Sequence, residues 1–264
     1  MAKLSSETLF HYVDKKDYLI DILKNNFRPR YVNETYDFQS SDLKKVAVPM
    51  LCFCDITLSN IEEHVEWYGR YGIGMNKEWA IRNGITPVHY YSSESYMQTQ
   101  LVFALEKLKR TLSQNSSDSS ELLEAYISMN YKLWFMKPYK GIQYHKKDRI
   151  EKSKNFYDER EWRYIPSIEE LKSTEENVPM SITGNILEEY NQNVQFKNMM
   201  NSKLRNNIML EFHPDDIAYI IVESENERKE MIEAIREAKF SYLVETKELL
   251  YSKIISYEQI RRDF

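Results

Sequence analysis

Several side chains in this sequence are of the types that bind a nucleotide sugar and act on its glycosidic bond. His11 could hydrogen-bond ribose hydroxyls, and Arg28 or Arg30 could pair with a pyrophosphate. Glu159 or Glu161 could stabilise the positive charge that develops at an anomeric carbon as such a bond breaks. These are the groups that a glycosyl-transfer site on NAD requires. The dispersed set also includes Tyr12, residues 53–55 and Tyr71, which stands beside glycines.

Each candidate also has a purely structural alternative. His11 could be a hydrogen-bonded histidine in the core or at a sheet edge. Arg28 and Arg30 could be solvated cations near the end of a helix, where the helix dipole favours them. Glu161 could form an exposed cross-strand pair with an arginine. The residue types alone leave both arginines, and both Glu159 and Glu161, as alternatives.

The motifs of the commonest catalytic classes are absent from the sequence. It contains no phosphate-binding loop, no glycine fingerprint for dinucleotides, no His-Glu-x-x-His helix, no paired-cysteine zinc site and no Gly-x-Ser-x-Gly elbow. We therefore predict no metal site. Cys52 and Cys54 are expected on opposite faces of one strand, as buried thiols that do not bridge each other. His64, His145 and His213 are expected in solvated helix or loop positions.

Strands and helices alternate in the first third of the predicted fold. Apolar patterning and glycine or proline positions predict these elements. Strands are expected at residues 8–12, 46–54, 71–75 and 87–91, and helices at about 18–26, 61–68 and 78–82. Residues 31–45 are polar and predict a loop between the first helix and the second strand.

A helical hairpin is predicted to follow, inserted between sheet strands. Helical spacing over 94–112 and 121–135 flanks a polar tip at 113–120. Residues 167–207 are polar and are expected to be the least regular part. Strands at 208–212, at 217–222 and around Ile254, with a helix at 225–238, are expected to complete the sheet. The whole chain, 1–264, is predicted to be one α+β domain with an insertion at about 94–135.

Composition limits the function classes. The net charge of −5 argues against indiscriminate binding to a polyanion. A local basic segment, with Lys137, Lys140, Lys146, Lys147 and Arg149 among tyrosines, nevertheless leaves nucleic-acid binding as an alternative. No apolar stretch reaches the ~20 residues of a membrane helix, and residues 1–5 contain no apolar signal core. We therefore expect a cytoplasmic protein with no membrane partner.

A series of local motifs resembles the AbiGi family of abortive-infection proteins over most of the chain. The matching strings are Leu-Phe-His-Tyr at 9–12, Phe-Arg-Pro-Arg-Tyr at 27–31, Val-Pro-Met-Leu-Cys-Phe-Cys-Asp-Ile at 48–56, Tyr-Gly-Arg-Tyr-Gly-Ile-Gly at 68–74, Tyr-Asp-Glu-Arg-Glu-Trp-Arg at 157–163 and the strand at 216–222. The resemblance implies an anti-phage or toxin-antitoxin role, with a toxin or antitoxin protein as partner.

A second, weaker similarity is to DNA-targeting ADP-ribosyltransferases of the DarT type. It implies an ADP-ribosyltransferase-like split mixed sheet with flanking helices, and NAD as co-substrate. By this similarity His11, with Tyr12, would hold the NAD ribose, and Arg28 or Arg30 would hold the phosphates or the reaction centre. Tyr71 would face the nicotinamide, and Glu161 the ribose at the breaking bond. The competing hypothesis is a non-catalytic antitoxin that binds a toxin or nucleic acid.

Overall fold

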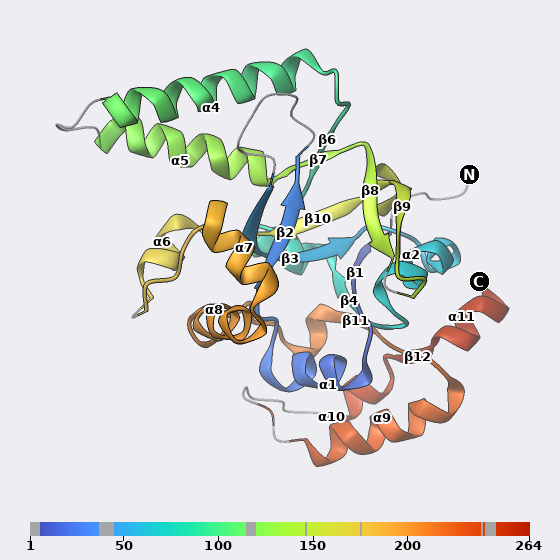
Figure 1. Cartoon of the computed structure of the whole chain (residues 1–264). Helices are drawn as coiled ribbons and strands as arrows, with labels where there is room; N and C mark the ends of the chain where they lie inside the picture. Colours follow the sequence, from blue (N-terminus) through green and yellow to red (C-terminus); the bar gives the residue numbers. More distant parts are fainter. Residues whose placement is uncertain are drawn as a thin grey trace.

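A twisted mixed sheet forms the centre of the molecule in the computed structural model, and helices flank it (Figure 1). The structure describes residues 6–36, 45–114, 120–145, 147–174, 176–238, 240 and 247–264. Within these residues the strand order is β12-β11-β4-β1-β3-β10-β5, and β2 pairs with β3. Neighbouring strands run antiparallel, except for the parallel pair β11 and β12. The strand bounds are β1 Thr8–Val13, β2 Arg30–Thr35, β3 Lys45–Cys54, β4 Tyr71–Asn76, β5 Thr86–Pro87, β10 Glu161–Tyr164, β11 Ile217–Val222 and β12 Ile254–Ser256.

The sheet is split between β1 and β3. These two strands share one register pair, Phe10 opposite Cys54. After Phe10, β1 continues to pair with β4 as far as Val13, while β3 pairs with β10 on its other side. The inner edges of β1 and β3 therefore diverge, which opens a space inside the sheet.

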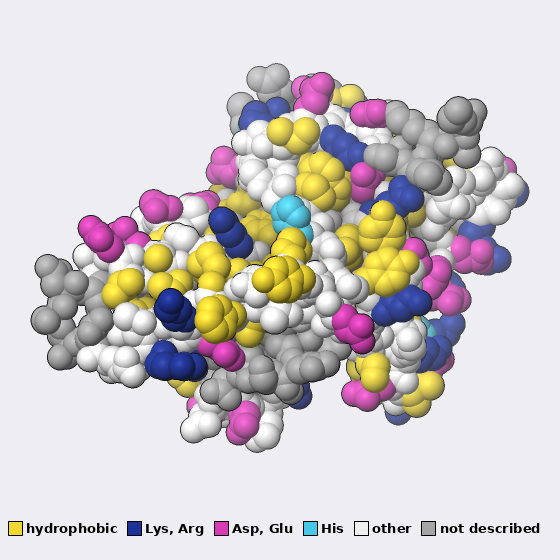
Figure 2. All heavy atoms as spheres, turned by 90° about the horizontal axis from the view of Figure 1, so that it is seen from above, with side chains coloured by type: hydrophobic (Ala, Val, Ile, Leu, Met, Phe, Trp, Pro, Cys, Tyr) yellow, Lys and Arg dark blue, Asp and Glu magenta, His cyan; other side chains and the backbone are white. Residues whose placement is uncertain are grey.

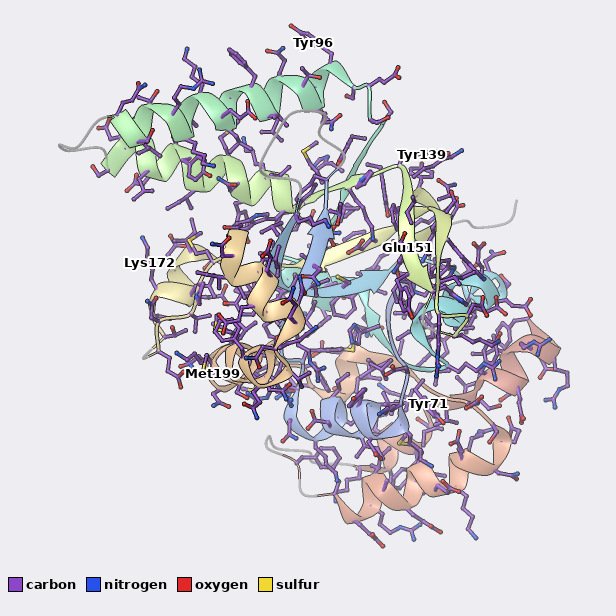
Figure 3. All side chains as sticks on the ribbon, in the orientation of Figure 1. Tyr71, Tyr96, Tyr139, Glu151, Lys172 and Met199 are labelled. Atoms are coloured by element: carbon purple, nitrogen blue, oxygen red, sulfur yellow. The ribbon has the colours of Figure 1, made fainter. Side chains whose placement is uncertain are left out.

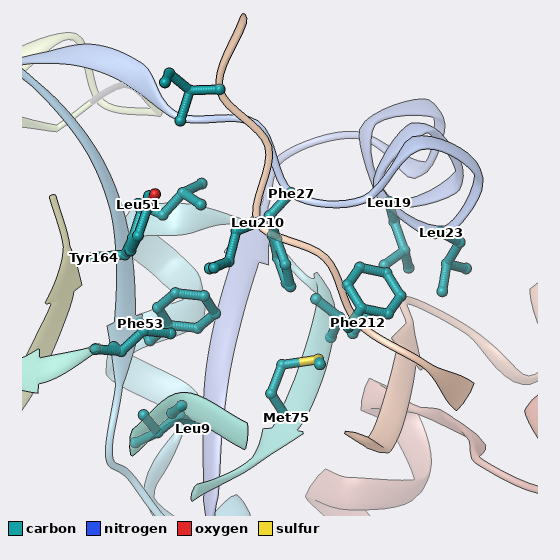
Figure 4. Packing of buried hydrophobic residues seen from close by; sticks show 14 of the residues in the cluster. Leu9, Leu19, Leu23, Phe27, Leu51, Phe53, Met75, Tyr164, Leu210 and Phe212 are labelled. Carbon is teal, nitrogen blue, oxygen red and sulfur yellow. The ribbon is translucent and has the colours of Figure 1, made fainter. Parts of the chain in front are cut away.

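The main apolar core lies on one face of this sheet. Leu9, Leu51, Phe53 and Met75 project from the strands onto this face (Figure 4). They pack against residues such as Leu19 of α1, because apolar positions on these helices recur at helical spacing. The longer helices of this face are α1 Lys16–Asn25, α7 Gly184–Gln192, α8 Val194–Asn207 and α9 Glu225–Glu237, and shorter helices add Trp79, Leu171 and Leu250.

The opposite face carries two smaller cores. One packs β3 against the hairpin of α4 Tyr96–Gln114 and α5 Ser120–Trp134. The other packs β1 against α2 Glu62–Tyr68 and α11 Tyr257–Asp263. The α4–α5 hairpin projects from the body of the molecule (Figure 1). It connects two short parallel strands, β6 His89–Tyr91 and β7 Met136–Pro138.

The segment after β7 lies over the gap between β1 and β3. Strands β8 Lys140–His145 and β9 Ile150–Asn155 form an antiparallel hairpin, and the short helix η3 Phe156–Glu159 leads into β10. The remaining elements are η2 Leu58–Asn60, α3 Lys77–Arg82, α6 Ile168–Lys172, η4 Pro214–Asp216 and α10 Lys247–Tyr251.

The structure corrects four predictions of local structure. Residues 30–35 form β2 instead of a loop, because a buried arginine pairs with Glu34 and allows a polar strand beside β3, whereas residues 37–44 of the expected loop lie outside the described residues. Residues 167–207 contain α6, α7 and α8, so this segment is not the least regular part. The strand expected at 208–212 is an isolated bridge between Phe27 and Leu210. The strand expected at 87–91 divides between β5 and β6, and residues 115–119 of the hairpin tip lie outside the described residues.

Candidate functional site

A cavity of about 670 Å³ lies where β1 and β3 diverge. The sheet contributes His11, Cys52 and Cys54 to its lining, while β7, β8 and η3 form the facing wall. The other residues that line it are Phe10, Tyr12, Val32, Asn33, Glu34, Thr35, Tyr36, Lys45, Phe53, His64, Tyr68, Lys137, Pro138, Lys140, Gly141, Ile142, Gln143, Phe156, Glu159 and Glu161. Its volume lies within the ~300–1,000 Å³ that is usual for sites that bind cofactors and other small molecules.

His11 bridges the split between the two strands. Its Nδ1 lies 2.7 Å from the carbonyl oxygen of Cys52, which only accepts hydrogen bonds. Nδ1 is therefore the protonated nitrogen of a neutral ring, and Nε2 is an acceptor. Burial lowers the pKa of His11 despite this hydrogen bond, so the neutral form persists at pH 7. The ring also packs edge-on against Phe27, which fixes its orientation.

Two carboxylates and a lysine form the centre of the cavity floor. Nζ of Lys137 on β7 lies 2.5 Å from Oε2 of Glu159 and 2.5 Å from Oε2 of Glu161. All three side chains are nearly buried, with 11%, 5% and 6% of their side-chain surface exposed, respectively. Ions this far from water must be paired, and here one ammonium group serves both carboxylates.

The ion pairs extend on either side of this centre. Arg163, which is fully buried, donates from Nε to Oε1 of Glu161 at 2.6 Å and from Nη2 to Glu34 at 2.9 Å. At the other end, Lys154 lies 2.6 Å from Oε1 of Glu159. Three acidic and three basic side chains therefore alternate along this chain of ion pairs, which we call the floor; Arg163 and Lys154 belong to it but do not line the cavity itself.

Both central carboxyl groups are held ionised. Burial raises the pKa of Glu161, but the adjacent charges of Arg163 and Lys137 outweigh it and bring that pKa well below its usual value. Burial raises the pKa of Glu159 and the charge of Lys137 lowers it; the lowering is the larger effect. The pKa of Glu34 is raised, because its burial outweighs the attraction of Arg163. Of these three carboxyl groups, Glu159 and Glu161 are therefore ionised at pH 7.

An aromatic wall stands beside the carboxylates. The ring of His64 on α2 lies 5.4 Å from that of Tyr12 and 4.6 Å from that of Tyr68, measured between centroids. Burial lowers the pKa of His64 to about 4, so this histidine is neutral. The Tyr68 hydroxyl donates to Glu159. A planar ring of a ligand could pack on this wall.

The structure separates the residues proposed for the site into two groups. His11, Tyr12, Glu159 and Glu161 line the cavity, although the Tyr12 hydroxyl itself is buried and finds no hydrogen-bond partner among the described residues. The candidates outside the lining are Arg28, Arg30 and Tyr71.

The three candidates outside the cavity have other contacts. Arg28 donates to the carbonyl oxygen of Arg205, and the guanidinium of Arg30 lies over the ring of Tyr18. The hydroxyl of Tyr71 donates to Glu227 on α9 at 2.9 Å. Figure 3 shows Tyr71 near the C-terminal helices, well below the β8–β9 hairpin that carries Glu151. All three side chains are thus engaged by contacts outside the cavity lining.

Several residues of the cavity floor were not identified from the sequence as site residues. Arg163 could have been found, since it stands two positions after Glu161 on one strand and so shares its face. The same rule corrects the expectation for the cysteines: Cys52 and Cys54 also share a face, and both line the cavity. They are free thiols, and burial raises the pKa of each.

The basic segment divides between the floor and the surface. Lys137 is engaged by Glu159 and Glu161, whereas Lys140, Lys147 and Arg149 are exposed. Lys146 lies outside the described residues.

Among the described residues no group of three His, Cys, Asp or Glu side chains could hold a metal ion. None of the helices that the structure describes is long and apolar enough to span a membrane.

Comparison with known proteins identifies the family. A family model described as "Putative abortive phage resistance protein AbiGi, antitoxin" matches residues 25–223, which is most of the chain. This chain belongs to the AbiGi family. The resemblance of its motifs to AbiGi proteins is thereby confirmed. The matched range includes the six charged residues of the cavity floor, and His11 precedes it.

A curated AbiGi relative supports the same assignment. The protein named "Abortive phage resistance protein AbiGi" from Lactococcus lactis subsp. cremoris is 32% identical to this chain over 260 residues. The alignment covers 90% of this chain and 99% of the relative. No solved structure matches the chain. The assignment of this chain to the family therefore rests on sequence.

Proposed function

We propose that this AbiGi protein is an anti-phage abortive-infection component whose working site is the cavity in the split sheet. Membership of the AbiGi family supports the defence role. We further propose that the cavity binds NAD and transfers its ADP-ribose to a macromolecule. The observation that carries this proposal is that His11, Glu159 and Glu161 line one cavity, although they come from distant parts of the chain.

The protonation states in the cavity suit this chemistry. The Nε2 atom of His11 can accept a hydrogen bond from a ribose hydroxyl, because Nδ1 already donates to Cys52. An ionised Glu161 can stabilise a ribose ring that becomes positively charged. The aromatic wall formed by Tyr12, His64 and Tyr68 can pack against a planar ring of the dinucleotide.

The proposed reaction is a substitution at the anomeric carbon of the nicotinamide ribose. The bond from this carbon to the nicotinamide nitrogen breaks, and neutral nicotinamide leaves with the electron pair. A nucleophilic atom of the acceptor forms the new bond to the same carbon and loses a proton. Positive charge builds up on the ribose between these events, close to where Glu161 would lie. Electrostatic stabilisation of this kind is commonly the largest catalytic contribution of an enzyme.

The direct test compares two glutamine variants in NAD cleavage. Purified protein is incubated with NAD carrying a labelled adenine, with and without DNA, RNA or phage-infected lysate. Released nicotinamide and acceptor-bound label are then measured. We expect Glu161→Gln to reduce both by at least about 100-fold. Glu151→Gln, at an exposed site on β9, should leave both unchanged. Equal turnover by wild type and Glu161→Gln would refute the proposed catalytic role.

A second candidate function is that of a non-catalytic antitoxin that binds a toxin protein. The exposed hydrophobic residues of α4 favour it, because Tyr96, Met97 and Phe103 are 78%, 57% and 63% exposed. Hydrophobic side chains and cations share the face that carries the α4–α5 hairpin, seen from above in Figure 2. Exposed apolar groups of this size often mark protein interfaces.

The antitoxin candidate is tested by co-expression with the neighbouring gene. If the chain is an antitoxin, it should relieve growth arrest caused by that gene product, and Tyr96→Ser with Phe103→Ser should abolish relief. Glu161→Gln should then still protect. Protection that requires Glu161 and tolerates the α4 substitutions would contradict an antitoxin that acts through this hairpin.

A further inference from the structure

Lys137 occupies a position in the cavity floor that neither of its cationic neighbours duplicates. Arg163 contacts Glu161 from β10, and Lys154 contacts Glu159 from β9. Only Lys137, among these three cations, lies at 2.5 Å from both carboxylates. Its ammonium also lies 4.8 Å from the centre of the Phe156 ring.

Two carboxylates that share a buried site repel each other. Without a cation between them, this repulsion raises the pKa of one of the pair, as in catalytic carboxyl pairs. The shared contact with Lys137 removes this repulsion. Besides Arg163 and Lys154, the ionisable groups that face this centre are Glu34 from β2, Tyr36 directly after it, Cys52 and Cys54 from β3, His64 and Tyr68 from α2, and Tyr90 from β6. None of these groups supplies a positive charge at pH 7.

We propose that Lys137 is a positioning residue that keeps Glu159 and Glu161 ionised together, and that it thereby holds Glu161 in its reactive form. The part of this inference that concerns reactivity rests on the function proposed above. The part that concerns ionisation rests only on the geometry of the floor. The two parts are separated by two measurements on the same variants.

The first measurement is unfolding by urea as a function of pH, which needs no activity. The variants are Lys137→Met, Lys137→Arg and the double variant Lys137→Met with Glu159→Gln. Lys140→Met, at the exposed rim of the same cavity, is the matched control.

In Lys137→Met one carboxyl should remain protonated in the folded protein above its unfolded pKa. At this site the folded state then binds more protons than the unfolded state, so the stability of Lys137→Met relative to wild type should rise as pH falls from about 7 to 5. Lys140→Met should show no such gain relative to wild type. The double variant should lack it too, because Glu161 no longer faces the charge of Glu159, and Lys137→Arg should resemble wild type. A Lys137→Met profile parallel to wild type would overturn the ionisation claim.

The double variant also guards against a single variant that fails to fold. If Lys137→Met is unfolded at pH 7, lowering the pH to about 5 should restore its fold, since protonation of one carboxyl removes the unpaired charge. A chain that stays unfolded at both pH values while the double variant also fails to fold would overturn the proposal, because Lys137 would then serve packing alone.

The second measurement is nicotinamide release as a function of pH. Lys137→Met should shift the acidic limb of the profile upward by at least one pH unit, and the double variant should move it back. A uniform loss at every pH, without recovery in the double variant, would overturn the positioning role. If even wild-type protein released no nicotinamide, the proposed function would fail, and the unfolding measurement would still decide the ionisation claim.

Discussion

Phe10 on β1 and Cys54 on β3 stand opposite each other in register, and the two strands diverge directly after this pair. Beyond this pair a side chain bridges the gap: Nδ1 of His11 donates a hydrogen bond to the carbonyl oxygen of Cys52. Cys54 is also in register with Glu161 on its other side. A single position in the sheet thus connects the opening of the split, the histidine that spans it and the carboxylate on its floor.

Two substitutions at His11 should separate its structural role from its ligand-binding role. Asparagine places an amide nitrogen where Nδ1 stands, so His11→Asn can keep the hydrogen bond to Cys52 and lose Nε2. Glutamine reaches the Nε2 position and leaves the Cys52 carbonyl without its donor. We expect His11→Gln to lose about 1 kcal/mol of stability. His11→Asn should weaken NAD binding by about 10-fold, measured by calorimetry. Unchanged binding by His11→Asn would contradict the role given to Nε2.

Arg163 should be essential for stability, in contrast to a surface arginine. Its side chain is fully buried and donates to Glu34, to Glu161 and to the carbonyl oxygen of Trp134. Arg163→Met leaves two buried carboxyl groups without this partner, so we expect a loss of about 3–5 kcal/mol in urea unfolding. Arg236→Met, at an exposed position on α9, should change stability by less than about 0.5 kcal/mol. Similar losses in the two variants would show that the ion pairs contribute nothing specific.

Much of the sheet could be predicted from the sequence, because its buried strands carry local signals. The apolar run before Asp55 became β3, and the glycine-containing stretch from Tyr71 became β4. In contrast, the sequence does not predict β2, because most of its residues are polar. Glu34 can be buried there only because Arg163, 129 residues away, neutralises it. The helices α7 and α8 did carry a helical spacing, for example Leu187 with Tyr190, that the polar composition obscured.

The site was predictable only in part, for a similar reason. Residue types indicated His11 and the two glutamates, and the fold places all three at one cavity. Their neutralising partners come from β7, β9 and β10, and no local pattern connects Lys137 to Glu161 across the intervening turn and hairpin. The charge of Arg30 makes it a candidate for binding phosphate, but at its place in the fold its guanidinium lies over the ring of Tyr18. Chemical type can identify candidates, whereas only the fold determines which of them meet.

His64 should make stability depend on pH between neutrality and about pH 4. Burial keeps it neutral in the folded protein with a pKa of about 4, while in the unfolded chain it ionises below about 6.5. The unfolded state therefore binds more protons in this range, and stability should fall as pH falls, by up to about 3 kcal/mol. His64→Phe keeps a ring beside Tyr12 and Tyr68. It should remove the part of the fall in stability with pH that His64 causes. An unchanged slope in His64→Phe, measured by urea unfolding at several pH values, would show that His64 is already charged in the folded state.

Gly69 should tolerate alanine far less well than Gly84, although both residues end helices in the left-handed region of φ. A Cβ at Gly69 would lie 2.3 Å from the carbonyl oxygen of Val13 and 2.5 Å from Cα of Asp14, which are backbone atoms that cannot rotate away. A Cβ at Gly84 would meet nothing within 4 Å. Gly84→Ala should therefore cost only the conformational strain, about 1–2 kcal/mol. Gly69→Ala adds overpacking and should cost about 3–5 kcal/mol in urea unfolding. Since Val13 and Asp14 end β1, the displaced strand should also carry His11 away from Cys52, so Gly69→Ala should weaken NAD binding as well. Equal costs for the two alanines would mean that the contact between α2 and the end of β1 can relax, and that the split does not depend on it.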